Sequence, residues 1–465
     1  MEERVNSYGL LLLSVSFLLL LLSPYLLSYG MFFDGITYSA VSRNLAIGFG
    51  SLWKPAYSLT LGREFYGHPP VGFWIQSVVY RLFGEALWLD KAYTLFIGAV
   101  NLALFYTLYG FLRRRGDPGF WAPLFLLSTF YAYRWVVRNN LLENTMSVFV
   151  LLSVIMYVLA LRKGSLYGIP AGLSVLTAFL VKGPVGTFPL IAPLLLPVDA
   201  RRDRRLKVLI IGLLVFTVSF LMLLSLPEVR HFFSQYLQRQ IVGSISGREN
   251  SVPTRLYIVY ALLTEILFPL VFLLPLLLFH IVRGDRNALN WNKRTFLLLL
   301  LALSGSLPIV LSLKQARFYL YPSLFFYSLF LVSLFRSPLK MFESRRLVKR
   351  LSFPLSVTLL TLSAFVSLKF AGTGMGGYVP FYRDFVENPL RLNLKKHEYL
   401  SICPKGLYGN WSMFAGMERA FKLSMALGDG SKYLLVDRIE CKQVPEGYTP
   451  IHEGERFVLY RKVRP

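Results

Sequence analysis

The chain has 465 residues, of which 55% are hydrophobic and 16% are charged, and its mean hydropathy is +0.51. Soluble globular domains carry more charge and fewer apolar residues, so this composition excludes a chain made only of such domains. A formal net charge of +25 would suggest nucleic-acid binding in a soluble protein, but basic residues also gather in the cytoplasmic loops of membrane proteins. We therefore expect an all-α polytopic membrane protein.

Apolar runs separated by polar breaks predict about eleven spans, because about 20 apolar residues cross a hydrocarbon core of roughly 30 Å. The first run is long, has no small-residue cleavage site and precedes further spans, which argues against a cleaved signal peptide. The run at 256–282 is long enough to be tilted or split, and the sequence at 182–184 predicts a hairpin or one broken helix. The expected spans are 9–29, 88–112, 119–136, 144–161, 166–181, 184–199, 208–226, 256–282, 295–312, 318–335 and 351–370.

Short basic loops alternate along the chain with longer loops of mixed charge. The basic loops are 113–117, 162–164, 200–207, 283–294 and 336–350; the others are 30–87, 134–143, 227–255, 313–317 and the tail 371–465. Every basic loop falls on one side of the membrane if the N-terminus is cytoplasmic, as the positive-inside rule requires. The alternation supports both the number of spans and the orientation, because one missing span between two basic loops would break it.

The loops of mixed charge contain two candidate surface helices. Segment 35–48 separates its apolar residues from a polar set that includes Ser39 and Arg43, and Gly48 is a typical helix end. Segment 227–243 has a similar pattern. Both are expected to be amphipathic helices that lie along the membrane surface.

The tail at 371–465 has the composition of a soluble protein. The segments 398–404, 432–437 and 456–463 predict strands, and 413–428 predicts a helix that ends at Gly428. We expect a small α/β domain outside the cytoplasm, next to a transmembrane domain at 1–370. Cys403 and Cys441 both lie in this tail, where a disulfide is permitted and two free thiols are equally compatible.

Polar and ionisable residues gather in the loops of mixed charge and at the span ends beside them. Such residues are costly near a hydrocarbon core and are candidates for function. All of them fall on the same side of the membrane. They are Asp34, Tyr66, His68, Arg138, Glu143, Lys182, Lys314, Arg317 and Tyr319.

Each candidate also has a purely structural interpretation. Asp34 and Glu143 can cap the helices that follow them, and Lys182 can reach toward the membrane surface or bind carbonyls at a helix C-terminus. A lone histidine such as His68 is more often a structural hydrogen-bonding group than a metal ligand. Several independent caps, however, need not gather on one face with acids and bases together.

Carboxylates and cations beside a bilayer suit the chemistry of a lipid-linked phosphate sugar. A carboxylate can orient or deprotonate an acceptor hydroxyl. Lysine and arginine can bind a phosphate and stabilise the negative charge that grows on it as it leaves. Phosphate is a good leaving group, so strong cations can take the place of a metal ion.

The pattern resembles the C-fold (GT-C) glycosyltransferases that use polyprenyl-phosphate sugars, in particular the broad family that joins protein O-mannosyltransferases to the aminoarabinose transferases of lipid A. The resemblance covers residues 10–335. In that family an aspartate, usually followed by glutamate, comes after the first span. Here Asp34 is followed by Gly35, so the second acid is missing.

Three further elements carry the resemblance. The segment His68-Pro69-Pro70, followed by Trp74, resembles a Lys-Pro-Pro element, and Glu143 matches an acid near the start of the fourth span. The segment TAFLVKGPVG at 177–186 resembles the Lys-Gly-Pro element and places Lys182. The segment LKQARFYLYP at 313–322 resembles the element that lines the donor phosphate site, and its matching residues are Lys314, Arg317, Tyr319 and Pro322.

The resemblance implies a GT-C fold with about 11 to 13 transmembrane helices and a glycosyltransferase that moves a sugar, with inversion, from undecaprenyl phosphate or a similar carrier. The acceptor would be lipid A, another glycan or protein. Asp34 would orient or activate it, and Glu143 and Arg138 would shape the acceptor side or support the surface helix. The carrier phosphate would contact Lys182, Lys314, Arg317 and Tyr319, with Tyr66 and His68 at the entrance.

This interpretation has three rivals. An oligosaccharide ligase or polymerase with a diphosphate donor would require more arginines on the outer side, and a transporter or flippase would show internal repeats and charges near the bilayer midplane. An inactive partner protein would explain the missing second acid. No cofactor is required; Asp34, Glu143 and His68 are capable ligands for a divalent metal, but no spacing indicates one.

We expect the protein to lie in the cell inner membrane. Its N-terminus would be cytoplasmic, and its active site and C-terminal domain would be extracytoplasmic. The expected partners are the lipid-linked donor, the acceptor and membrane lipids, and no nucleic acid.

Overall fold

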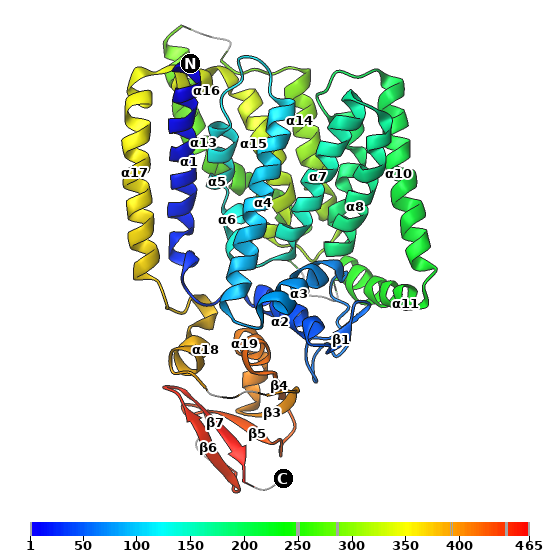
Figure 1. Cartoon of the computed structure of the whole chain (residues 1–465), viewed down its shortest axis with the longest axis vertical. Helices are drawn as coiled ribbons and strands as arrows, with labels where there is room; N and C mark the ends of the chain where they lie inside the picture. The colour runs from blue at the N-terminus through cyan, green and yellow to red at the C-terminus, as the bar shows by residue number, and fades with distance from the viewer. Residues whose placement is uncertain are drawn as a thin grey trace.

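The computed structural model describes residues 2–247, 252–284, 288–390, 392, 394–441 and 445–463. Figure 1 shows a bundle of long helices, with the β-sheet of the C-terminal residues lying beyond one end of it. The helices of the bundle are α1 (Glu2–Leu26), α4 (Trp88–Leu112), α5 (Trp121–Thr129), α6 (Tyr131–Arg138), α7 (Leu142–Arg162), α8 (Gly168–Lys182), α9 (Ala192–Leu195), α10 (Arg202–Leu224), α13 (Tyr257–Val282), α14 (Lys293–Ser304), α15 (Tyr321–Leu334), α16 (Arg336–Ser344) and α17 (Arg346–Lys369).

In the described ranges, nine helical segments are long and apolar enough to cross a membrane, and they coincide with nine of the expected spans. The other two expected spans, 119–136 and 184–199, are broken helices. Phe130 has an extended backbone that separates α5 from α6. In the second, the 3₁₀ helix η2 (Pro184–Ile191) precedes α9, because prolines interrupt the hydrogen bonding of an α-helix.

The two ends of the bundle differ in charge (Figure 1). The N-terminus and the basic loops lie at one end, which we call the basic end. There Asp117 forms ion pairs with Arg294 at 2.8 Å and Arg336 at 2.9 Å, which joins three of the basic loops. Residues 285–287 of the fourth basic loop lie outside the described residues. The opposite end, which we call the site end, carries the loop 30–87, the helix α11 and the β-sheet.

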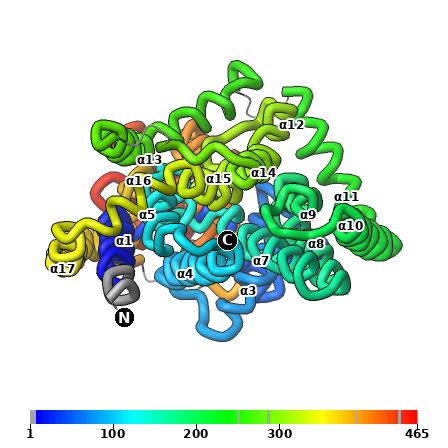
Figure 2. The backbone as a smooth tube through the Cα atoms, turned by 90° about the horizontal axis from the view of Figure 1, so that it is seen from above, coloured from blue at the N-terminus to red at the C-terminus, as the bar shows by residue number. Residues whose placement is uncertain are grey.

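The first and last spans form a pair at one edge of the bundle. Figure 2, a view along the spans, shows α1 and α17 side by side and away from α10, and α1 packs more extensively against α17 than against any other described element. The buried residues of α17 are all serines: Ser352, Ser356, Ser363 and Ser367. Small side chains of this kind allow two membrane helices to approach closely.

The loop 30–87 contains α2 (Phe33–Ala46), α3 (Val71–Phe83) and a short hairpin of β1 (Gly50–Ser51) and β2 (Lys54–Pro55). The expected helix at 35–48 is therefore present, and its position along the membrane surface stays a prediction. Its polar residues Ser39, Ser42 and Arg43 are buried, because a helix near the C-terminus, α19 (Trp411–Phe421), packs against α2.

The segment 227–243 forms a surface helix as expected. It folds as α11 (Pro227–Tyr236) and continues as the π-helix η3 (Leu237–Val242) and α12 (Gly243–Ser246). Val229, Phe232, Phe233 and Tyr236 form the buried face of α11, whereas Arg230 and His231 are exposed.

The C-terminal residues form a five-stranded sheet in the order β4-β3-β5-β7-β6, in which β3 pairs in parallel with β4 and β5. The strands are β3 (Glu398–Cys403), β4 (Leu423–Ala426), β5 (Tyr433–Asp437), β6 (Tyr448–Glu453) and β7 (Phe457–Lys462), and the short helix α18 (Val379–Tyr382) precedes them. We call α18, α19 and this sheet the sheet region. The strands expected at 398–404, 432–437 and 456–463 are confirmed. The helix expected at 413–428 was wrong in its second half, because Lys422 adopts a left-handed conformation (φ 59°) that ends α19, and β4 follows.

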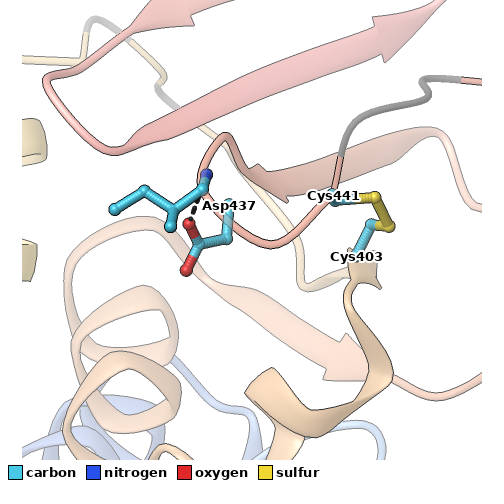
Figure 3. The surroundings of a disulfide bond; sticks show 4 residues. Cys403, Asp437 and Cys441 are labelled. Carbon is cyan, nitrogen blue, oxygen red and sulfur yellow. Dashed lines mark hydrogen bonds between the residues drawn. A yellow bond between two sulfur atoms is a disulfide. The ribbon is translucent and has the colours of Figure 1, made fainter.

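Cys403 and Cys441 form a disulfide (Figure 3). Cys403 is the last residue of β3, and Cys441 follows the turn after β5, in which Asp437 Oδ1 accepts a hydrogen bond from the backbone of Ile439. The bond therefore joins the ends of two adjacent parallel strands.

Candidate active site

Asp34 lies in the first turn of α2, at the site end of the bundle. It does not act as the N-cap: that position is Phe32, whose side chain makes no capping bond. Among the described residues no hydrogen-bond partner of the Asp34 carboxylate is found. Burial raises the pKa of Asp34 to about 6; Lys182 and Lys314 oppose this rise and Glu143 adds to it.

Gly35 explains the missing second acid. A Cβ atom at this position would lie 1.8 Å from the carbonyl oxygen of Asn139, which is far inside van der Waals contact. Only glycine fits while α2 holds this position against the end of α6. The Asp-Glu pair of the resembling family therefore has no room for its second residue here.

Lys182 and Glu143 form a buried ion pair beside Asp34. Lys182 is the last residue of α8 and Glu143 lies in the first turn of α7. Lys182 Nζ lies 2.9 Å from Glu143 Oε1, and the Glu143 side chain is 0% exposed. The ammonium also faces the rings of Tyr319 at 5.3 Å and Tyr38 at 5.8 Å. A charge buried in this way is stable only with a partner, so each residue fixes the other.

His68 lies within this cluster. Its Nε2 is 2.9 Å from the hydroxyl of Tyr38, one helical turn after Asp34 on α2. Burial, together with Lys182 and Lys314, lowers the pKa of His68 well below its ordinary value, so the ring is neutral at pH 7. The two prolines that follow His68 lead directly into α3.

A cavity of about 1270 Å³ extends from this cluster into the bundle. Its walls are mostly apolar and come from η2, α14, η3, α12 and η4 (Leu307–Leu311). Ile191, Ile245 and Leu311 line it and are exposed, so apolar side chains remain accessible in its walls. Its polar lining residues are His68, Lys182, Thr187, Tyr236, Gln240, Ser244, Ser304, Ser312, Lys314 and Tyr319.

Lys314 and Tyr319 line one cavity with Lys182 and His68, and their role in binding a substrate stays a prediction. Lys314 Nζ is also 3.5 Å from Gln240 Oε1 on η3. Since two lysines and a neutral histidine meet at one end of an apolar cavity, this arrangement can bind an anion that carries a long apolar chain.

Arg317, Arg138 and Tyr66 do not line this cavity. Arg317 Nε lies 3.7 Å from Glu265 Oε1, and its Nη2 donates to Thr264 at 3.2 Å, so it faces α13. Arg138 is stacked on the ring of Tyr25 at 3.8 Å and on that of Trp135 at 4.6 Å.

Tyr66 is buried against α11, with its ring 5.4 Å from that of Phe232. Its hydroxyl donates to Glu64 at 2.8 Å and lies 3.1 Å from His231 Nε2. Burial, with the bond to Glu64, raises the pKa of Tyr66 to about 12, so the phenol is neutral. Arg239 lies over its ring at 5.4 Å.

The sequence analysis did not predict three residues that lie beside the candidate site residues. Gln240 and Ser312 line the cavity beside Lys314, and Tyr38 contacts His68. Tyr38 could have been found because it follows Asp34 by one helical turn, whereas nothing in the sequence brings Gln240 to Lys314. Among the described residues, no group of three or more His, Cys, Asp and Glu side chains could hold a metal ion.

Comparisons with known proteins give the same fold. The family model for dolichyl-phosphate-mannose-protein mannosyltransferases matches residues 67–226, and no curated protein sequence matches the chain. ArnT from Cupriavidus metallidurans bound to undecaprenyl phosphate is 12% identical, with a TM-score of 0.65 and 97% of each chain covered. The apo state of the same ArnT is 14% identical, with a TM-score of 0.64 and 97% of each chain covered. The chain is thus a multi-pass membrane protein with the GT-C fold of ArnT, as the resemblance in its sequence predicted.

Proposed function

We propose that the protein is a membrane glycosyltransferase that takes a sugar from a polyprenyl-phosphate carrier. The observation that carries this proposal is the apolar cavity that ends at Lys182, Lys314 and His68, beside Asp34. The apolar walls of the cavity of about 1270 Å³ suit an isoprenoid tail, and its cationic end suits the phosphate. The family model and the undecaprenyl phosphate bound to ArnT support the same donor class.

Asp34 acts as the general base in this proposal. Its carboxylate takes the proton from an acceptor hydroxyl while the hydroxyl oxygen forms a bond to the anomeric carbon of the sugar. The bond between that carbon and the phosphate oxygen breaks, and its electron pair leaves with the carrier phosphate. Attack on the face opposite the leaving phosphate inverts the anomeric centre. A pKa of about 6 keeps Asp34 ionised at pH 7 and close to the optimum for a base.

Lys182 and Lys314 stabilise the charge on the departing phosphate. Tyr319 and the neutral His68 complete the wall around it. Glu143 holds Lys182 in place through the 2.9 Å ion pair, so we assign it a supporting role and not direct contact with the acceptor. Arg317, which is paired with Glu265, would reach the carrier only by leaving that pair.

Arg138 serves the acceptor side of Asp34. Among the described residues it has no carboxylate partner, and its guanidinium is held between Tyr25 and Trp135. Phe32, just before Asp34, packs against Trp135 at 5.6 Å between ring centroids. An acceptor that reaches Asp34 from this side meets a fixed cation and aromatic rings. Tyr66 lies at the other side, at the aqueous entrance.

The orientation follows from charge and redox chemistry. The positive-inside rule supports a cytoplasmic basic end, and the site end would then lie on the outer face of the inner membrane. The disulfide between Cys403 and Cys441 supports this placement, because disulfides persist outside the reducing cytoplasm. Residues 371–465 would then form a small extracytoplasmic domain.

The experiment uses the purified protein in lipid nanodiscs with a panel of polyprenyl-phosphate sugars and crude envelope acceptors. Release of free polyprenyl phosphate is followed by mass spectrometry for the wild type, Asp34→Asn and the control Asp429→Asn, whose side chain is 86% exposed. The proposal expects release by the wild type and the control and none by Asp34→Asn. If no donor is consumed with any acceptor, the glycosyltransferase proposal fails, and transport of the lipid-linked sugar becomes the better explanation.

A further inference from the structure

The sheet region holds α2 by a buried arginine. Arg43, near the end of α2, is 1% exposed. Its Nη2 donates to the backbone oxygen of Glu418 at 2.7 Å and lies 3.6 Å from Glu418 Oε1, both on α19. His397, just before β3, lies 2.8 Å from the same carboxylate oxygen. The C-terminal end of the helix that carries Asp34 is thereby anchored to residues from the other end of the chain.

A second connection starts at the neighbouring residue of α19. The guanidinium of Arg419 donates to Asp90 on α4, at 2.7 Å to Oδ1 and 3.1 Å to Oδ2, and to the backbone oxygens of Glu85 and Ala86. Asp90 Oδ1 also accepts a 2.5 Å hydrogen bond from the hydroxyl of Tyr80 on α3. Arg419, Asp90 and Tyr80 are all buried.

The hydrogen bonds that start at Arg419 continue from Tyr80 to Gly35, the residue after Asp34. Gln76 Nε2 donates to the Tyr80 hydroxyl at 2.9 Å, and Gln76 Oε1 accepts from Asn140 Nδ2 at 3.2 Å. Asn140 Nδ2 also lies 2.9 Å from Ser39 Oγ and 3.4 Å from the backbone oxygen of Gly35. Every side chain in this chain of hydrogen bonds is buried.

We propose that this hydrogen-bonded chain from Arg419 to Gly35 fixes the position of Asp34, so that Asn140, Gln76 and Tyr80 are positioning residues for transfer and the sheet region is part of the active unit. This inference rests on the proposed role of Asp34. Two features indicate that these hydrogen bonds hold the start of α2 in a defined position. Asn140 has a φ of 51°, a conformation that asparagine tolerates better than most residues. Gly35 lies against Asn139 with no room for a Cβ atom.

The rate of sugar transfer should depend on how accurately Asp34 is positioned. A displacement of about 1 Å of a catalytic group can lower a rate by as much as 100-fold. Asn140 holds α2 near its start, Gln76 contacts it at Ser39 and Ser42, and Arg43 holds it near its end. Loss of one link should therefore let the helix shift without unfolding it. The two cations assigned to the carrier phosphate, Lys182 and Lys314, lie on α8 and on the 307–319 segment, not on α2. Donor binding should therefore be retained, although His68 contacts Tyr38 of α2.

The test uses Tyr80→Phe in the full-length protein, with Tyr93→Phe as the matched control. Tyr93 on α4 is also a buried tyrosine, and its hydroxyl is 2.9 Å from Thr145 Oγ1, outside the chain of hydrogen bonds. Three quantities are measured: kcat for sugar transfer, affinity for undecaprenyl phosphate, and hydrogen–deuterium exchange of residues 33–46. Asn140→Gly, which keeps the backbone conformation and removes the side chain, is the second variant if Tyr80→Phe does not fold.

We expect kcat to fall about tenfold in Tyr80→Phe, the equivalent of one buried hydrogen bond, with faster exchange of 33–46 and unchanged carrier affinity. Tyr93→Phe should change none of the three. The inference is overturned if Tyr80→Phe keeps wild-type kcat and exchange, or if both variants lose activity equally. If the wild type transfers no sugar, the proposed function fails, and unchanged exchange of 33–46 in Tyr80→Phe would separately refute the link to α2.

Discussion

Replacement of Asp34 by asparagine should abolish transfer and at the same time stabilise the protein. The pKa of Asp34 rises from 3.8 to about 6 in the folded chain, and each pH unit of such a rise corresponds to about 1.4 kcal/mol. At pH 7.5 the ionised carboxylate therefore destabilises the fold by up to about 3 kcal/mol. Asparagine has nearly the same shape and no charge, so it removes this cost.

The sign of the pH dependence is set by the direction of the pKa change. A carboxyl with a raised pKa favours the folded state fully below its unfolded pKa of 3.8, and this contribution is lost as the pH rises through about 6. The stability gained by Asp34→Asn should therefore be largest above pH 7 and should shrink toward pH 4. Transfer by the wild type should show the opposite trend and rise through about pH 6, because the base acts only when it is deprotonated.

Both effects can be measured on the same nanodisc samples. Thermal unfolding is followed by tryptophan fluorescence between pH 4 and pH 8, and transfer is followed by release of free carrier. General-base catalysis contributes about 10² to 10⁴-fold to a rate, so transfer should fall by at least the lower value. Asp429→Asn, at an exposed site, should leave both measurements unchanged.

Two results would refute the reasoning. A lower unfolding temperature for Asp34→Asn at pH 7.5 would mean that the carboxylate is stabilised by its surroundings and not strained by burial. Wild-type transfer by the variant would mean that Asp34 is not the base, even if the stability change has the expected sign.

Three further predictions test other parts of the structure. Lys314→Gln should weaken binding of undecaprenyl phosphate about tenfold and reduce its dependence on salt, measured by native mass spectrometry, whereas the exposed Lys405→Gln should bind as the wild type does. Gly35→Ala should lose transfer and unfold at lower temperature, because its Cβ would meet the carbonyl of Asn139 at 1.8 Å; normal activity would contradict this close approach. Cys403→Ser should destabilise the sheet region by up to about 4 kcal/mol, as expected for a cross-link over 38 residues, and proteolysis of 371–465 should become faster; equal protease resistance in the variant would contradict this.

The spans were largely predictable, because hydrophobic length depends on local sequence. The segments 88–112 and 257–282 were found almost to the residue, and the alternation of basic loops matches their common location at the basic end. The breaks at 119–136 and 184–199 were harder to predict. A hydropathy pattern measures apolar length, and it does not distinguish one long helix from two short helical segments in line.

The sequence indicated which residues gather at the candidate site better than it indicated how they pair with one another. Lys182, Lys314, Tyr319 and His68 meet in one cavity, in agreement with the motifs of the resembling family. The pairing of Lys182 with Glu143 could not be predicted, because it depends on how α7 and α8 pack. For the same reason the sequence did not show that Arg317 faces α13.

Two features depend on residues outside the local sequence pattern. The pattern of 35–48 predicted an amphipathic helix but not that its arginine would contact α19, which lies far away in the sequence. The amphipathic pattern of 413–428 was extended through Lys422, where the left-handed backbone starts a strand instead. In both cases the local sequence pattern was recognised, but the local pattern does not contain the contacts and backbone conformation that determine the structure.

The pairing of α1 with α17 also sets the order in which the protein can be completed. During synthesis α1 leaves the ribosome first, and its most extensive partner among the described elements, α17, leaves only after the other spans. Below the pair, the backbone of Tyr29 bonds to Thr373 and Met375, so the two chain segments that emerge from the membrane are tied together. A chain that stops before residue 346 would leave one side of α1 against lipid, and this edge of the bundle would be incomplete until the last helix is inserted.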